Sequence, residues 1–316
     1  MIAKVFKQYS YVSITVSALL LCLISYNYSN LTATWLSFQT KSLNFLLILA
    51  ILIITIRAIG RVFQFLSIGK SNYYMLMYPL IVLSFPAESL DLRLLFCPAL
   101  FFSGWSFFRE YVEKRNTITS NQSMILLFDS ILLISISSIL FIEHLFLLLF
   151  LLIGLAFSKK SINSKELGVF IIIPILLFFT TYTIFLVFDV DALFFSSILS
   201  LKKLSFSNQF NLSFIYYNPA LLYVFFLFMC SLLLLFRKKS SYDIQTLDYD
   251  GLFYFGTLLS VIAFVNPLSG IELHYLSLPL TYYTHHLLLW KKSLSFANFI
   301  FISLIISVLL FTFVLN

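Results

Sequence analysis

Charged residues are scarce in this sequence, and that scarcity decides its class. Of its 316 residues, 61% are hydrophobic and only 10% are charged. Soluble domains are typically about 45–50% apolar and about 25% charged. No soluble core of this length could bury so much apolar surface. The composition therefore excludes a soluble protein and predicts an integral membrane protein with many spans.

Cysteine is sparse, and the motifs of several enzyme classes are missing. Cys22, Cys97 and Cys230 lie far apart inside apolar runs. We therefore expect no disulfide framework, no metal site and no cofactor. The sequence contains no P-loop, no GxSxG, no HExxH and no Rossmann fingerprint. No motif thus identifies a chemistry, and whether the protein is an enzyme stays open.

Long apolar runs divide the chain into predicted membrane spans. A span needs about 20 apolar residues to cross about 30 Å of hydrocarbon. The predicted spans are 11–27, 43–60, 72–87, 93–109, 124–142, 145–158, 167–188, 212–236, 251–266, 273–290 and 294–314. Two of them, 72–87 and 145–158, are short, so nine or ten spans are alternatives to eleven. The predicted fold is an all-α polytopic transmembrane helix bundle, with 1–316 forming a single integral membrane domain.

The basic residues indicate the orientation of this bundle. With a cytoplasmic N-terminus, all but four of the 20 Lys and Arg fall on the cytoplasmic side. The four exceptions are Lys41, Arg93, Lys202 and Lys203. Cytoplasmic loops of membrane proteins carry an excess of Lys and Arg. The formal net charge of +7 is thus a consequence of topology, and we expect no nucleic-acid partner. Lys4 and Lys7 precede an apolar stretch without a small-x-small cleavage site, which predicts an uncleaved first span.

Asp129 stands near one end of the apolar run "FDSILLISISSILFIEHLF" (128–146). A carboxylate at the centre of a membrane helix costs about 2.5–3.5 kcal/mol on insertion scales and usually faces the bundle interior. On a helix, Asp129 shares one half of the surface with Ser130, Ser137 and Ser138. Two interpretations stay open: a polar contact between helices, or a proton or ligand role. If Asp129 faces the bundle, Asp129→Asn should be tolerated better than Asp129→Leu.

Arg57 and Arg61 are four residues apart, on one helical face at the cytoplasmic end of the second predicted span. Long basic side chains in this position commonly extend their charged heads to the lipid headgroups while their stems cover apolar surface. The alternative is a clamp on an anionic lipid or lipid phosphate, because two guanidinium groups on one face suit phosphate oxygens.

Acidic residues on the external side provide the candidates for catalysis. Glu88 and Asp91 lie in the second external loop, and "GIELHYLSLPLTYY" (270–283) places Glu272 and His274 at the outer mouth of a span that Pro279 can kink. A carboxylate near a histidine suits general acid or base catalysis on a lipid-linked substrate. The alternative is that acidic residues gather in external loops because basic residues are excluded there.

Three stretches of the chain resemble one family. They are "FLSIGKSNYYMLMYPLIVLSFP" (65–86), "LLFDSILLISISSILFIEHLFLLLFLLIGLAF" (126–157) and "HYLSLPLTYYTHHLLLWKK" (274–292). Together they resemble an uncharacterised family of polytopic inner-membrane proteins of Gram-negative bacteria, which carry a domain of unknown function. The resemblance runs roughly from the second span to the end of the chain. It implies a multi-pass protein of the bacterial inner (cytoplasmic) membrane, and it brings no catalytic residues.

Members of that family are sometimes labelled beta-carotene 15,15'-monooxygenase. Carotenoid-cleaving enzymes of one type hold iron with four histidines on a β-propeller. The four histidines of this chain are His144, His274, His285 and His286. We expect them on two faces of a helical membrane bundle, where they cannot converge on one iron. The label therefore does not fit this sequence, and the adjacent His285 and His286 receive no role.

Two classes of function remain, and both keep the bilayer as a partner. The first is a non-enzymatic component or subunit of a cell-envelope assembly with a protein partner, which fits the short loops and the missing motifs. The second is an enzyme or translocator that acts on polyprenyl-linked glycan or lipid at the periplasmic face, like O-antigen polymerases. Such enzymes commonly carry an acidic residue in the first external loop, and "NYSNLTATWLSFQTK" has none. The first class is favoured.

Overall fold

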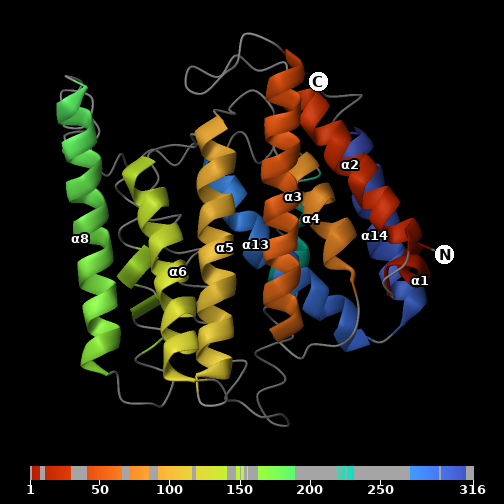
Figure 1. The fold of residues 1–316 in the computed structure, drawn as a ribbon. Coiled ribbons are helices and arrows are strands. Elements are labelled where there is room, and N and C mark those ends of the chain that lie inside the picture. Colours follow the sequence, from red (N-terminus) through yellow and green to blue (C-terminus); the bar gives the residue numbers. More distant parts are fainter. Residues whose placement is uncertain are drawn as a thin grey trace, which may run out of the picture.

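The computed structural model shows an α-helical bundle (Figure 1). It describes residues 2–7, 11–29, 41–65, 72–84, 92–115, 119–140, 163–188, 271–291 and 293–310, with shorter pieces inside 147–155 and 220–230. Every described element is an α-helix, which confirms the predicted all-α fold class.

The helix bounds follow the apolar runs of the sequence. The helices are α1 (Ile2–Lys7), α2 (Tyr11–Ser29), α3 (Lys41–Phe65), α4 (Tyr74–Leu83), α5 (Leu92–Lys114), α6 (Ser120–Leu140), α8 (Ser164–Val187), α13 (Ile271–Lys291) and α14 (Leu294–Leu310). Among them, α2, α3, α6 and α8 are long and apolar enough to cross a membrane. The predicted span 251–266 lies outside the described residues, and 145–158 and 212–236 are described only in part.

Helix α4 is shorter than its prediction. A span was expected over 72–87, but the helix has only 10 residues, which rise about 15 Å and cannot cross a bilayer. Eight of its residues, Tyr74 and Leu76–Val82, are buried, because α4 packs against α2, α3, α13 and α14. Two hydroxyls of α2 tie it in place: Tyr28 donates to the carbonyl of Val82 over 3.2 Å, and Ser17 donates to that of Met75.

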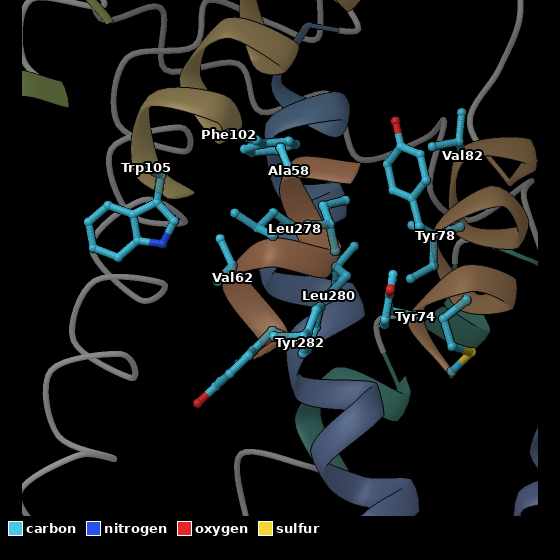
Figure 2. Close-up of a cluster of buried hydrophobic side chains, with 14 of the residues drawn as sticks. Ala58, Val62, Tyr74, Tyr78, Val82, Phe102, Trp105, Leu278, Leu280 and Tyr282 are labelled. Atoms are coloured by element: carbon cyan, nitrogen blue, oxygen red, sulfur yellow. The ribbon is translucent and has the colours of Figure 1, made fainter. Parts of the chain in front are cut away.

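The interior beside α4 is filled by side chains from four helices (Figure 2). The labelled residues are Ala58 and Val62 of α3, Tyr74, Tyr78 and Val82 of α4, Phe102 and Trp105 of α5, and Leu278, Leu280 and Tyr282 of α13. All of them are buried. Helices α4 and α13 therefore pack together in this interior, although almost 200 residues of chain separate them.

Several buried hydroxyl groups in these helices donate hydrogen bonds within their own helix. Ser25, Thr55 and Thr281 are buried, and each donates to the carbonyl oxygen four residues earlier in its own helix. In a membrane, a polar group without such a partner would cost several kcal/mol. Many of the buried serines and threonines are thus compatible with a lipid surround and identify no site by themselves.

A glycine allows α5 and α6 to approach closely. A Cβ atom built on Gly104 would lie 2.8 Å from the backbone oxygen of Ser130 and 2.9 Å from Cγ1 of Ile134. Small residues at such contacts let helix backbones come together, which is the usual way in which membrane helices associate.

Helix α1, at the start of the chain, contacts α14, the last described helix. Ala3 and Phe6 of α1 are buried, whereas Lys4 and Lys7 are exposed. The backbone N–H of Ala3 donates to Oδ1 of Asn298 over 2.8 Å, which fastens α1 to α14. The N–H of Asn72, just before α4, donates to the carbonyl of Phe6 over 3.1 Å.

Helix α8 lies at the edge of the bundle (Figure 1). Only 11% of its membrane-length window is buried, against 39% for α2 and 44% for α3 and α6. Its buried residues are Glu166, Phe170, Ile173 and Pro174, all in the first half of the helix. From residue 175 onward every residue of α8 is at least partly exposed.

Candidate functional site

Charged side chains from three helices meet at one end of the bundle. They come from the C-terminal ends of α3 and α5 and from the N-terminal end of α8, and they include Arg61, Glu110, Lys114, Arg115 and Glu166. We call this group the charged end cluster. The topology predicted from the basic residues places this end of the bundle in the cytoplasm.

One half of the charged end cluster is built around Glu110. Its Oε2 lies 3.0 Å from Nη2 of Arg61 on α3, and its Oε1 accepts a 2.7 Å hydrogen bond from Nζ of Lys114, one turn later on α5. The Glu110 side chain is 11% exposed, whereas those of Arg61 and Lys114 are 41% and 43% exposed. The guanidinium of Arg61 also covers the ring of Phe107, 4.5 Å from its centroid.

The other half is built around Glu166 in the first turn of α8. Nη2 of Arg115 lies 2.6 Å from its Oε1 and 2.8 Å from its Oε2. The hydroxyl of Tyr111 donates to Oε1, and the N–H of Asn163 donates to Oε2 over 2.8 Å. The side chain of Glu166 is only 6% exposed and that of Arg115 only 15%. This carboxylate therefore has three donors and fixes the start of α8 against the end of α5.

Tyr111 lies beyond the predicted end of its span at residue 109. Burial, followed by the hydrogen bond and the negative charge of Glu166, raises the pKa of its hydroxyl above the ordinary value. The hydroxyl thus stays protonated and acts as a donor to Glu166. The arrangement can hold helices together through charge-assisted hydrogen bonds.

The structure describes only some of the residues that were predicted from the sequence. Arg57 is exposed on α3, and Arg61, one turn later, belongs to the charged end cluster. Glu88 and Asp91 lie outside the described residues. Glu272 and His274 fall in the first turn of α13, and their side chains are outside what the structure describes. The external acid–base hypothesis thus stays a prediction.

The sequence analysis singled out only Arg61 of the charged end cluster; it missed Glu110 and Glu166, their partners Lys114 and Arg115, and Tyr111, which donates to Glu166. Glu110 and Glu166 carried a local signal. Glu166 follows Asn163 by three residues at the start of an apolar run, the spacing of a capping box, and the structure forms that box. Glu110 precedes Lys114 by four residues, the spacing of a helical ion pair. Tyr111 carried no local signal, because its partner lies 55 residues away.

His285 received no role from the sequence, and the structure places it in an aromatic environment. It is 1% exposed, with the ring of Phe63 at 4.8 Å and the ring of Tyr73 at 5.9 Å, centroid to centroid. Within the described part of the chain, no group of three or more His, Cys, Asp or Glu could hold a metal ion. His285 thus joins α13 to α3 and α4 by ring packing.

Asp129 differs in burial from the three serines with which the sequence grouped it. Ser130, Ser137 and Ser138 are completely buried, whereas Asp129 is only half-buried. The buried positions of α6, which include Ile131 and Ile134, centre on the opposite side of the helix from Asp129. The helical projection was right for the serines, but it did not locate the centre of the buried face.

We expect Asp129→Leu to accumulate in membranes at least as well as the wild type. Asp129 is only half-buried, and its carboxylate opposes insertion by about 2.5–3.5 kcal/mol at a helix centre. Protein level in washed membranes measures this. Ser130→Leu is the control, because Ser130 is fully buried beside Gly104 and leaves no space for a larger side chain. Loss of Asp129→Leu with normal Asp129→Asn would instead show a required polar contact.

Comparison with known proteins places no constraint on the site. The chain matches no family model, no curated protein and no solved structure. The resemblance to a family of inner-membrane proteins therefore stays a prediction. What the structure shows is a helical bundle with four apolar, membrane-length helices among its described residues, fastened at one end by the charged end cluster.

Proposed function

We propose that the chain is a non-enzymatic, multi-pass component of a cell-envelope assembly in the bacterial inner membrane, and that a neighbouring subunit packs against α8. The observation that carries this proposal is the low burial of α8. Only 11% of its membrane-length window is covered by the rest of the chain, against 39–44% for the other three membrane-length helices.

The exposed face of α8 combines apolar bulk with hydroxyl groups. Leu176, Phe179, Thr180 and Thr183 fall within one sector of about 100°, and all four are exposed. The hydroxyl of Thr180 donates to the carbonyl of Leu177 over 3.0 Å, and that of Thr183 to the carbonyl of Phe179 over 2.9 Å. Threonine among larger apolar residues is typical of helix–helix contacts in membranes.

The charged end cluster supports the same interpretation. The ion pair of Arg115 with Glu166 holds the first turn of α8 at a fixed place on α5. The remaining contacts of α8 are mainly with α6. A helix that is anchored at one end and at least partly exposed along its outer half can present a defined surface without rearranging the bundle.

Site-specific photo-crosslinking in native membranes tests this proposal. A photoreactive residue at Leu176, Phe179 or Thr183 should yield an adduct with one protein of discrete mass. Leu19 and Leu23 of α2 are the matched controls, because they are 65% and 47% exposed on an apolar helix of the same bundle. The controls should yield lipid adducts only.

Two results would contradict the proposal. Adducts with lipid alone at every position of α8 would mean that the bilayer covers this helix. A glycolipid or polyprenyl adduct at α8, without protein, would favour the class that acts on lipid-linked substrates.

A further inference from the structure

The Glu110 half of the charged end cluster presents positive charge outward. The carboxylate lies beneath two cations, since its side chain is 11% exposed and those of Arg61 and Lys114 are 41% and 43% exposed. The group carries one negative and two positive charges, and Arg57 stands one turn earlier on the same face of α3. Glu110, Arg61 and Lys114 together therefore carry a net charge of +1, with the two cations outermost.

Arg61 is held in a fixed orientation on this surface. Its Nη2 pairs with Oε2 of Glu110 at 3.0 Å, and its guanidinium covers the ring of Phe107 at 4.5 Å. A guanidinium has five N–H donors in one plane, and a single carboxylate oxygen cannot occupy them all. The remaining edge suits the paired oxygens of a phosphate, which guanidinium groups bind bidentately.

Arg57 favours a nearby anion for a different reason. It is exposed and falls within the apolar window Lys41–Phe63 of α3, six residues before its end. A charged side chain that faces hydrocarbon is costly and extends toward the interface. A phosphate drawn to this level would neutralise it. The surface potential of a cytoplasmic leaflet that contains anionic lipids attracts such cations as well.

We propose that Arg57 and Arg61 bind the phosphate of an anionic phospholipid from the cytoplasmic leaflet, with Lys114 adding to the local positive charge. Glu110 and Phe107 act as positioning residues for Arg61. The site lies between α3 and α5, on helices other than α8, so this proposal does not depend on the subunit role proposed above.

Lipid titration monitored by native mass spectrometry tests the site on the purified full chain. Phosphatidylglycerol and phosphatidylcholine serve as the two probes. Arg57→Gln removes one exposed charge, and Arg61→Lys keeps the ion pair with Glu110 but loses the planar fork. Lys165→Gln is the matched control, because Lys165 is exposed in the first turn of α8 and its loss changes the net charge equally.

The expected result is a preference for phosphatidylglycerol that falls about fivefold in Arg57→Gln, the effect of one cation near a lipid surface. Arg61→Lys should also weaken this preference, and Lys165→Gln should leave it unchanged.

An equal fall in Lys165→Gln would overturn the proposal, because the preference would then follow net charge alone. So would displacement of the lipid by inorganic phosphate at equal concentration, which would indicate a soluble anion. The proposal would also be overturned if Arg57→Gln released an acidic protein from the chain in native membranes but left the lipid preference of the purified chain unchanged.

Discussion

Glu166→Ala is expected to lower the free energy of unfolding by about 3–5 kcal/mol, the usual cost of removing one partner from a buried ion pair. The substitution leaves the guanidinium of Arg115 and the hydroxyl of Tyr111 without their shared acceptor, and it removes the acceptor for the N–H of Asn163. Each of these donors then stays shielded from water after losing its hydrogen bond to Glu166, which costs free energy.

Denaturation of the purified protein in mixed micelles measures this loss. A double-mutant cycle of Glu166→Leu and Arg115→Met, with both single variants measured, separates the energy of the pair from that of its surroundings. We expect Glu166→Leu with Arg115→Met to be less destabilised than either single variant, because an apolar pair of similar volume carries no stranded charge. Additive losses in the double variant would show that the two side chains do not act as a pair.

Gly104→Ala is expected to destabilise the bundle by about 1–3 kcal/mol, the usual cost of overpacking. The new Cβ would lie 2.8 Å from the backbone oxygen of Ser130. The backbone cannot rotate away as a side chain can, so α5 and α6, which pack against each other at this point, must separate.

Gly168→Ala is the matched control for this prediction. The nearest atom to a Cβ at Gly168 is Cδ1 of Ile172 at 3.9 Å, an ordinary contact. Alanine is also favoured over glycine in a helix by about 0.8–1.0 kcal/mol. We therefore expect Gly168→Ala to be neutral or stabilising in the same denaturation assay. Equal stability of both variants would mean that α5 and α6 do not pack at Gly104.

The helices could be predicted from the sequence where one long apolar run makes one helix. The predicted starts of α2, α5, α13 and α14 lie within two residues of the observed ones. Helix α4 was overestimated, because the apolar composition of 72–87 does not reveal that its neighbours bury a helix of 10 residues on every side. Composition predicts that a segment avoids water, but it does not distinguish lipid from protein as the surrounding medium.

The charged end cluster could be predicted only in its local parts. The capping box of Glu166 and the helical spacing of Glu110 with Lys114 are visible in the sequence. The partners Arg115 and Tyr111 are 51 and 55 residues from Glu166 in the sequence. No helical or strand periodicity indicates a contact between residues so far apart along the chain. The sequence interpretation of Arg61 as a lipid ligand also lacked Glu110, which orients it.

The short helix α4 has a consequence for biogenesis. A segment of 10 residues cannot be held across a bilayer by hydrophobicity alone, and two of the helices that enclose it, α13 and α14, are synthesised some 200 residues later. The hydrogen bond from the N–H of Ala3 likewise forms only once Asn298, 295 residues further along the chain, has been synthesised. Helices α2 and α3, which precede α4 in the chain, can pack against it first, and its burial is complete only after α13 and α14 have been synthesised.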